Sequence, residues 1–396
     1  MQAWRRHLPE SYDILVIGGG IHGCGIAQHA AASGYKTRLI EMNTIASGTS
    51  SQSTKLIHGG LRYLEQVNLK LVYEGLAERE HLLRLAPDLV SREWFYIPVY
   101  ASSKRPAWMI GAGLLLYWLL SGGRSRFKRV PQRLWSAVLP GLNKKDLKAI
   151  LAYEDAATDD AALTRAVAAS ASSFGCVISE HTKLEKAKHD GEIWRVTLAH
   201  GEEITTKILI NATGAWVNRV SKHIKPAPLQ QSLRLVQGSH LMLNRTCPGF
   251  IYTESLDGRV MFFRPWQGKT LAGTTETTVT GNPANIKPTA DEISHILGTY
   301  NHYFPDSPCR KTDIIGTYCG LRVLPESENG AFSASRETVL LCDDETEPSY
   351  IAVYGGKLTT YRKESERVLK LIAKSIKAPR KIDTKQIPLS AAGPTM

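Results

Sequence analysis

The sequence predicts an α/β protein in which a Rossmann-like dinucleotide-binding domain is combined with an α+β domain built on an antiparallel sheet. A glycine-rich turn between a buried strand and a helix near the N-terminus predicts the first domain. Alternating apolar and polar runs with tight turns, within residues 233–276, predict the second. The length of 396 residues fits two domains of roughly 100–200 residues each.

The composition is that of a globular protein with a strongly basic balance. Hydrophobic residues make up 43% of the chain, and the formal net charge is +12, which favours anionic partners. No zinc-spaced Cys/His set and no RNA-binding signature occurs, so we expect neither a metal site nor a nucleic acid partner. Six scattered cysteines without a CxxC pair, and an N-terminus without an apolar signal segment, predict a cytosolic protein with reduced thiols.

The glycine turn follows the pattern GxGxxG at Gly18, Gly20 and Gly23. Gly18 permits the tight turn, Gly20 lets the backbone approach a pyrophosphate, and Gly23 lets the following helix pack closely on the strand. We expect that helix to cover residues 21–32, with its N-terminal amides and positive dipole end directed at the phosphates.

A second strand, residues 37–41, ends with Glu41. An acidic residue at this position holds a ribose through its hydroxyls and repels a 2′-phosphate, which argues against NADP. The motif alone does not distinguish FAD from NAD.

The next stretch, residues 46–64, is rich in small hydroxyl residues and glycine and then places His58, Arg62 and Tyr63 close together. Hydroxyls and backbone amides suit a long cofactor in an extended pose, and the pair Gly59-Gly60 would let a flat ring approach the backbone. We interpret this stretch as a flavin loop.

With these segments in view, the chain resembles the FAD-dependent glycerol-3-phosphate dehydrogenases of the D-amino-acid-oxidase-like flavoprotein superfamily. The resemblance runs from about residue 13 to about residue 362. It rests on the segments SSQSTKLIHGGLRYLE, LAEREHLLRLAP, RPAWMIGAGLLLYWL, INATGAW, QGSHLML, YCGLRVLP and YGGKLTTYRK. It implies one FAD, no nicotinamide, and oxidation of sn-glycerol 3-phosphate to dihydroxyacetone phosphate, with hydride passing from the substrate C2 to the flavin N5.

The resemblance also implies which residues meet the cofactor. The adenosine and pyrophosphate part would contact Gly18, Gly20, Ile21, His22, Gly23, Glu41 and Met42. The flavin side would contact Thr49, Ser50, Ser53, Leu56, Gly59 and Gly60. Two further segments complete the set: Ala212, Thr213 and Gly214 near the adenine dinucleotide, and Gly355, Gly356, Lys357, Leu358 and Thr359 near the isoalloxazine ring.

Four cations at matching positions are implied to bind the anionic substrate. They are Arg62, Arg322, Arg336 and Lys357, with Tyr63 adding a hydroxyl donor. His58 and His240 are the two imidazoles in matching motifs, and either is a candidate to take the hydroxyl proton. Arg322 and Lys357 would polarise the C2 oxygen as it becomes a carbonyl.

The superfamily interleaves its two domains, and the coarse pattern of the sequence agrees. We expect residues 10–95, 150–225 and 330–380 to form the Rossmann-like FAD-binding domain, of the glutathione-reductase-like type. Residues 96–149 and 226–329 would form the substrate domain, and residues 381–396 a tail. Longer family members continue into a further helical domain, which this sequence, ending at Met396, is expected to lack.

Residues 107–120 are nearly all apolar. Fourteen residues are too few to cross a bilayer as a helix, which needs about 20. Six cations frame the run: Lys104, Arg105, Arg124, Arg126, Lys128 and Arg129. We expect a helix lying in the headgroup layer at the inner face of the cytoplasmic membrane, with a quinone as electron acceptor. A buried helix or a subunit contact is the alternative, and the oligomeric state stays open.

Three other functions remain open from the sequence. The chain could be an oxidase, could act on another anionic 2-hydroxy substrate, or could be a shortened flavoprotein without catalysis. The complete set of site residues argues against the shortened, non-catalytic flavoprotein, and the dehydrogenase of glycerol metabolism is the leading hypothesis.

Overall fold

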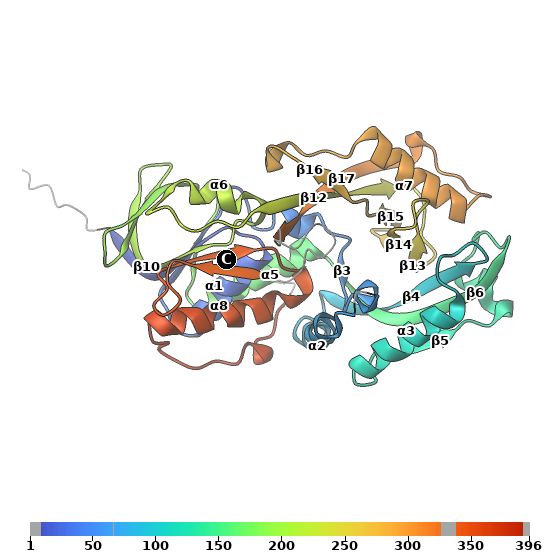
Figure 1. Cartoon of the computed structure of the whole chain (residues 1–396), viewed down its shortest axis with the longest axis horizontal. Coiled ribbons are helices and arrows are strands. Elements are labelled where there is room, and N and C mark those ends of the chain that lie inside the picture. The colour runs from blue at the N-terminus through green and yellow to red at the C-terminus, as the bar shows by residue number, and fades with distance from the viewer. Residues whose placement is uncertain (1–8, 66, 326–337, 391–396) are drawn as a thin grey trace, which may run out of the picture. The chain divides into compact units, whose positions relative to one another are not determined.

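The computed structural model describes residues 9–65, 67–325 and 338–390 and divides the chain into two compact units (Figure 1). The first unit combines residues 1–51, 161–234 and 323–396, and the second combines residues 52–160 and 235–322. Each unit is therefore assembled from segments that lie far apart in the sequence.

The first unit is built on a mixed sheet that has nine strands in the described residues. The strands are β1 (Glu10–Ile17), β2 (Thr37–Ile40), β7 (Val177–Ser179), β8 (Leu184–His189), β9 (Trp194–Leu198), β10 (Glu203–Asn211), β11 (Ile224–Lys225), β18 (Val339–Cys342) and β19 (Tyr350–Tyr354). At its centre β1 pairs in parallel with β2 and with β10, and β10 continues in parallel to β19. Parallel strands that are buried on both faces require continuous apolar runs, and residues 14–17 of β1 are all buried.

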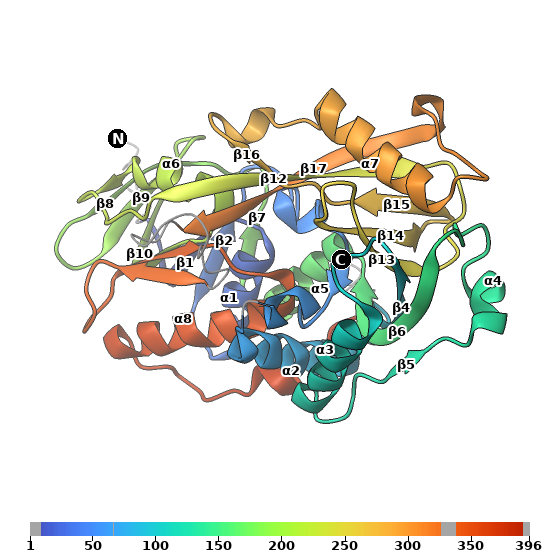
Figure 2. The ribbon, with the colours of Figure 1, turned by 45° about the vertical axis from the view of Figure 1, so that its right-hand side comes forward.

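Helices and short 3₁₀ turns cover this sheet. The α-helices are α1 (Ile21–Ala32), α5 (Asp160–Ser173), α6 (Val217–Ser221) and α8 (Tyr361–Ser375). The 3₁₀ turns are η1 (Thr49–Ser51), η4 (Gly214–Trp216), η7 (Leu358–Thr360) and η8 (Thr384–Gln386). Figures 1 and 2 show α1 and α8 side by side, and a Cβ added at Gly25 of α1 would lie 2.5 Å from the ring of Tyr361. Glycine at this position therefore sets how closely the two helices approach.

The second unit is built on a sheet that has ten strands in the described residues. The strands are β3 (Leu56–Ile57), β4 (Val90–Tyr100), β5 (Phe127–Arg129), β6 (Leu147–Thr158), β12 (Leu233–Leu243), β13 (Phe250–Glu254), β14 (Val260–Trp266), β15 (Lys269–Gly273), β16 (Thr277–Val279) and β17 (Ile314–Pro325). The meander β13–β14–β15 is antiparallel, as the alternating pattern of residues 233–276 predicts. The long pair β4–β6 is also antiparallel.

Four α-helices belong to the second unit: α2 (Leu69–Leu85), α3 (Ala107–Leu120), α4 (Trp135–Val138) and α7 (Ala290–Tyr303). Its 3₁₀ turns are η2 (Leu61–Leu64), η3 (Gln132–Leu134), η5 (Pro283–Asn285) and η6 (Lys311–Asp313). Figure 2 shows α2 and α3 next to each other, and both contribute to one core cluster with β4 and β6. Within the described residues, no helix has the length and apolar character needed to cross a membrane.

The unit boundaries differ from those expected from the sequence. Residues 52–95 and 150–160 belong to the second unit, because β3, β4 and β6 pair within its sheet. The expected tail at residues 381–396 is in part ordered packing: η8 lies there, and Thr384 accepts a hydrogen bond from Arg362 at 3.0 Å. All six cysteines lie in described residues, and none forms a disulfide.

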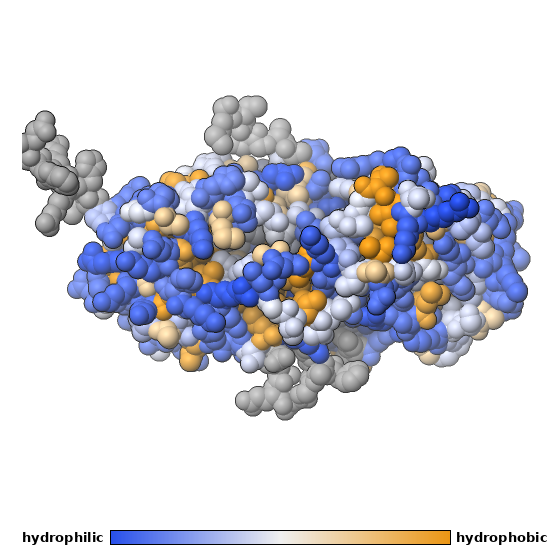
Figure 3. Space-filling model, turned by 90° about the horizontal axis from the view of Figure 1, so that it is seen from above, coloured by the Kyte–Doolittle hydropathy of each residue, from blue (hydrophilic) through white to orange (hydrophobic). Residues whose placement is uncertain are grey.

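The surface shown in Figure 3 is mainly hydrophilic, with apolar side chains in separate patches. This pattern is ordinary for a chain with 22% charged residues.

Candidate active site

The glycine turn has the geometry that its sequence predicts. Gly18 has φ +108°, and a Cβ there would lie 2.7 Å from the carbonyl oxygen of Ala212. A Cβ at Gly23 would lie 1.9 Å from the carbonyl oxygen of Gly18, so no side chain fits. At Gly20 the nearest atom is the Ser50 hydroxyl at 3.3 Å. The fold itself thus requires glycine at positions 18 and 23, whereas a Cβ at Gly20 would meet only the Ser50 hydroxyl.

The N-terminus of α1 is suited to an anion. Its N-cap, Gly20, makes no side-chain capping bond, and the first turn of the helix holds no acidic side chain. The amide of Ile21 donates to Ser50 Oγ at 2.9 Å, which brings the predicted cofactor residue Ser50 to this end of the helix. Helix N-termini without an acidic cap attract phosphate groups through their amides and dipole.

Glu41 follows β2 directly and braces the turn. Its Oε2 accepts from the amide of Gly19 at 2.6 Å, and its Oε1 accepts from the amide of Asn43 at 2.8 Å. Each carboxylate oxygen can accept a further hydrogen bond, so the ribose role stays compatible with this geometry. The predicted contact Met42 is 46% exposed.

The segment from Ala212 to Gly214 lies against the glycine turn, as predicted. Ala212 donates its amide to the carbonyl of Ile17 at 2.9 Å, and Gly214 has φ +56°. The hydroxyl of Thr213 donates to Asn211 Oδ1 at 2.6 Å. Three sequence segments, around residues 18, 50 and 213, therefore meet at one edge of the first unit's sheet.

His22 lies beside the second predicted glycine pair, Gly355-Gly356. Both glycines have positive φ, and a Cβ at Gly356 would lie 2.3 Å from His22 Nε2 and 2.9 Å from the hydroxyl of Thr338. Neither ring nitrogen of His22, nor the Thr338 hydroxyl, has a hydrogen-bond partner among the described residues. Burial lowers the pKa of His22 to about 4, so the ring is neutral at pH 7. Buried polar atoms without partners are typical of a site completed by a ligand.

The remaining cofactor candidates of the first unit cluster near the start of α8. Leu358 and Thr359 form η7, with Thr359 buried and Lys357 at its N-cap. Thr49, another predicted cofactor contact, is the first residue of η1.

Two side chains of the flavin loop, those of Ser53 and Leu56, make contacts within the second unit. Ser53 donates its hydroxyl to Asp160 at 2.6 Å, and Asp160 also forms an ion pair with the buried Lys55 at 2.5 Å. The Leu56 side chain packs in the hydrophobic core with Leu71 and Val72. Ser53 and Leu56 stay predicted cofactor contacts, and within the second unit they make these structural contacts.

Residues 58–60 lead into η2, which begins at Leu61. His58 is half-buried, whereas Gly59 and Gly60 are buried. Gly60 has φ +83°, and a Cβ there would lie 2.2 Å from the ring of Tyr63, which is itself 4% exposed. The two glycines therefore let the chain turn tightly beneath an aromatic ring.

Arg62 and Arg322 meet at one carboxylate. Nη1 of Arg322 lies 2.9 Å from Glu276 Oε1, and Nη1 of Arg62 lies 3.3 Å from the same oxygen. The three side chains are about a quarter to a third exposed. Arg322 also reaches toward Gly238, where a Cβ would lie 3.2 Å from its Nη2. Guanidinium groups offer several donors in a fixed plane, which suits an anionic ligand.

His240 lies in the same unit, on β12. Its Nε2 is 2.9 Å from the Thr54 hydroxyl, and its ring stacks on Tyr318 at a centroid distance of 4.8 Å. Its Nδ1 has no hydrogen-bond partner among the described residues. Burial, with the nearby charges of Arg322 and Lys55, lowers the pKa of His240 to about 3, so its imidazole is neutral at pH 7.

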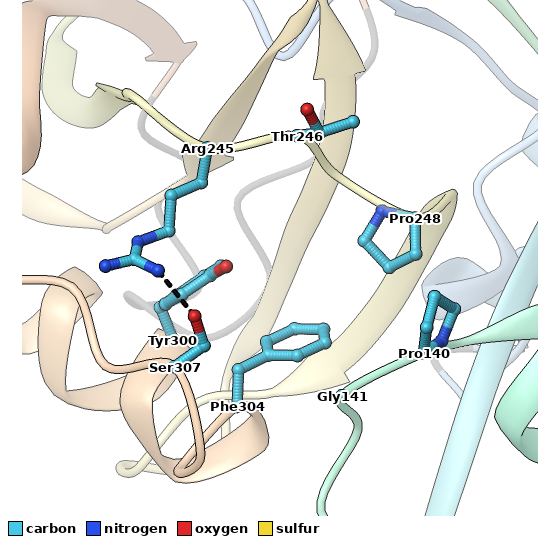
Figure 4. Close-up of a pocket in the computed structure, with 8 residues that line it drawn as sticks. All are labelled: Pro140, Gly141, Arg245, Thr246, Pro248, Tyr300, Phe304 and Ser307. Carbon is cyan, nitrogen blue, oxygen red and sulfur yellow. Dashed lines mark hydrogen bonds between the residues drawn. The ribbon is translucent and has the colours of Figure 1, made fainter.

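Arg336, the fourth predicted cation, lies outside the described residues. A shallow hollow of about 270 Å³ in the second unit is lined by Arg245, Tyr300, Phe304 and Ser307, among others (Figure 4). None of the predicted site residues lines it, and Arg245 donates to Ser307 at 2.5 Å.

Sequence reasoning missed Glu276, Thr54 and Tyr117. Glu276 lies three residues after the end of β15 at Gly273. Its position beside Arg62 and Arg322 becomes visible only in the folded structure, which brings the three residues together. Tyr117 is hidden within an apolar run, where its hydroxyl gives no signal.

Comparison with known proteins adds to this geometry. A family model described as FAD dependent oxidoreductase matches residues 13–362. The chain belongs to this family. The glycine turn, the N-terminus of α1 without an acidic side chain, and the unpartnered polar atoms beside Gly356 fit a dinucleotide, and FAD is the family's cofactor. The earlier resemblance to this flavoprotein superfamily is confirmed.

Individual relatives cover most of the chain. A glycerol-3-phosphate dehydrogenase of Pseudomonas tolaasii is 37% identical over 375 residues, spanning 92% of this chain and 72% of the relative. A D-erythritol 1-phosphate dehydrogenase of Brucella abortus is 34% identical over 381 residues, spanning 91% of this chain and 73% of the relative. The crystal structure of a Bacillus halodurans glycerol-3-phosphate dehydrogenase with FAD superposes with a TM-score of 0.75 at 28% identity. That match covers 96% of this chain and 68% of the other.

Proposed function

We propose that this oxidoreductase converts sn-glycerol 3-phosphate to dihydroxyacetone phosphate and passes the electrons to a quinone. The observation that carries the proposal is the convergence of Arg62 and Arg322 on Glu276, in the unit that also holds His240. The Pseudomonas and Bacillus relatives named for this activity support it.

The chemistry divides between cofactor and protein. FAD, when bound, accepts the hydride from C2 of the substrate. Arg62, with Arg336 and Tyr63, binds the phosphate, and Arg322 and Lys357 stabilise negative charge on the C2 oxygen. Guanidinium groups suit the phosphate because they offer several donors in a fixed plane.

The hydroxyl proton passes to an imidazole, either His58 or His240. A neutral ring is the form that accepts a proton, and the lowered pKa of His240 keeps its ring neutral. Burial is the main cause of that lowered pKa, and the charges of Arg322 and Lys55 add to it. A bound phosphate dianion would oppose only the effect of the two cations.

Most of the proposed cofactor contacts lie in the first unit, and Gly59 and Gly60 lie in the second. We assign the pyrophosphate to Gly18, Gly20, Gly23 and the start of α1, and the ribose to Glu41. The segments at residues 212–214 and 355–359 complete the site. Gly59 and Gly60 present backbone to the ring.

A second substrate has specific support. The Brucella relative is named for D-erythritol 1-phosphate, at an identity close to that of the glycerol-3-phosphate dehydrogenases. Both compounds are phosphorylated polyols.

The proposed substrate is tested by comparing kcat/KM for sn-glycerol 3-phosphate, D-erythritol 1-phosphate and glycerol, with a soluble dye as acceptor. We expect glycerol 3-phosphate to be preferred and glycerol to be very poor. Preference for the four-carbon phosphate would reassign the substrate.

We further propose that α3 lies in the headgroup layer of the inner face of the cytoplasmic membrane. Its outer face exposes Trp108, Met109, Leu115 and Leu119, at 45–72% of their surface. Cations flank the helix on both sides, and anionic lipid would bind them. This location brings the enzyme close to quinone.

A further inference from the structure

The backbone of the loop at residues 58–62 is fixed by a side chain of α3. The amide of Gly59 donates to Tyr117 Oη at 2.9 Å, and that hydroxyl donates to Asp155 Oδ2 at 2.7 Å. Asp155 also accepts from Arg79 Nη1 at 2.9 Å. Tyr117, Asp155 and Arg79 are at most 1% exposed, so the chain of hydrogen bonds is sealed from water.

The direction of these hydrogen bonds is set by the surroundings. Burial, reinforced by the charge of Asp155, raises the pKa of Tyr117 well above its usual value, so its hydroxyl stays protonated. A protonated hydroxyl that donates to Asp155 has its lone pairs left for the amide of Gly59. Arg79 balances the charge of Asp155. Tyr117 therefore acts as a permanent acceptor for this one amide.

Helix α2 holds the same loop from another side. A Cβ at Gly75 would lie 3.0 Å from the Cα of Gly59, and a Cβ at Gly59 would lie 2.6 Å from Leu76. Arg79, one turn further along α2, belongs to the hydrogen-bonded chain just described. Gly59 is thus enclosed by α2 and by the hydroxyl of α3, with no room to shift toward either.

The enclosed segment carries two residues of the proposed reaction, His58 and Arg62, on either side of the fixed amide. We propose that Tyr117 is a positioning residue for substrate oxidation: its hydroxyl holds the 58–62 backbone where His58 and Arg62 meet the substrate. This inference rests on the proposed function. Tyr117 lies on the buried face of α3, opposite to the exposed apolar side chains that are proposed to contact lipid.

The test compares Tyr117→Phe with Tyr153→Phe in the FAD-loaded, full-length protein. Tyr153 contacts Tyr117 ring to edge at 5.9 Å in the same core, and its hydroxyl forms no hydrogen bond with the 58–62 loop in the described part of the chain. For Tyr117→Phe we expect faster amide exchange at Gly59, a higher KM and a lower kcat for glycerol 3-phosphate. The loss in kcat/KM should be roughly 10- to 100-fold, as for a small misplacement of reacting groups. Tyr153→Phe should stay within about twofold of wild type, because the loop keeps its acceptor.

A second variant disturbs the loop from α2. Gly75→Ala pushes on Gly59 by a few tenths of an ångström and should change KM and kcat in the same direction as Tyr117→Phe. If both variants keep FAD and match Tyr153→Phe in KM and kcat, the hydroxyl is only structural and the proposal is overturned.

Failure of the proposed function is recognised separately. If wild-type protein is not reduced by glycerol 3-phosphate, the flavin midpoint potential and absorbance maxima decide the positioning role. A shift in Tyr117→Phe but not in Tyr153→Phe supports it, and identical values in both variants overturn it.

Discussion

Arg62 and Arg322, which come from distant parts of the sequence, both direct Nη1 at the same oxygen, Oε1 of Glu276. Each guanidinium group has several donors, so an anion can bind beside the carboxylate without displacing it. The carboxylate also holds the two cations in place before substrate arrives. Such pre-ordering reduces the entropy that binding must otherwise offset.

Removing either arginine should therefore impair catalysis through the phosphate. Arg62→Ala and Arg322→Ala should each lower kcat/KM for glycerol 3-phosphate. The loss should correspond to roughly 2–5 kcal/mol of transition-state stabilisation, the range for a broken buried charge pair. Because both side chains are partly exposed, the lower end is expected. Arg195→Ala, which removes an exposed arginine of the first unit, is the control. Steady-state rates with a dye acceptor measure the effect. Unchanged kcat/KM in both variants would assign the pair to structure alone.

Two glycines of the turn should separate folding from cofactor binding. Gly20→Ala places a methyl group 3.3 Å from the Ser50 hydroxyl, a tight contact that a small shift of this side chain relieves, so the apoprotein should fold but bind FAD weakly. Gly23→Ala places a methyl group 1.9 Å from the carbonyl of Gly18 and should destabilise the apoprotein itself. Thermal unfolding without cofactor and FAD titration distinguish the two effects. Normal FAD affinity in Gly20→Ala would mean that the pyrophosphate does not pass this residue.

The buried His240 should make stability depend on pH. Its folded-state pKa of about 3 lies below its ordinary value of 6.5. The unfolded chain therefore binds the extra proton as pH falls below 6.5, and stability is lost on acidification from there toward the folded-state pKa. The contribution is roughly 1.4 kcal/mol per pH unit.

Denaturant unfolding of wild type and His240→Gln at pH 7.5 and 5 measures this contribution. The wild type should lose more stability between the two pH values than the variant does. His200→Gln, which replaces an exposed histidine, should behave as wild type. An equal loss in His240→Gln and wild type would show that His240 titrates normally in the folded state.

The exposed face of α3 should bind anionic lipid. Leu115→Glu combined with Leu119→Glu should abolish sedimentation with anionic vesicles, since apolar burial is lost and charge is added. FAD should remain bound, because both side chains are about half exposed. Arg105 and Arg126 are ion-paired with Glu254 and Glu154, so the other flanking cations should supply most of the attraction to lipid, at about 1 kcal/mol each. Salt should therefore release part of the wild-type protein.

A matched control replaces an apolar residue elsewhere. Leu229→Glu changes a leucine that is 68% exposed in the first unit and should leave vesicle binding intact. Loss of FAD or precipitation of the α3 double variant would instead indicate a buried helix. Equal vesicle binding by the double variant and wild type would also refute the lipid contact.

Local patterns predicted the elements well. The helices at residues 21–32 and 107–120 begin and end where the sequence indicates, because glycines and apolar runs act within one segment. The glycine turn follows for the same reason. The family resemblance supplied Arg62, Arg322 and His240, which the structure places in one unit.

Long-range contacts were not predictable. Strands β3 and β6 pair although about a hundred residues separate them in the sequence. Because of this pairing, the second unit begins at residue 52 and not, as the sequence had suggested, at residue 96. Ser53 stays a predicted cofactor contact, and no local pattern in the sequence indicates that its hydroxyl also donates to Asp160. Glu276 and Tyr117 have no local signal, because their importance comes from partners in other segments. Short apolar or polar runs do not encode which segments meet.

An anaerobic titration of the FAD-loaded protein with sn-glycerol 3-phosphate tests the central claim most directly. The proposed reaction transfers two electrons to the bound flavin, so its visible absorbance should bleach as substrate is added, and dihydroxyacetone phosphate should form in equal amount. Glycerol at the same concentrations should leave the spectrum unchanged. An oxidised flavin spectrum that persists at saturating glycerol 3-phosphate would contradict the proposed function.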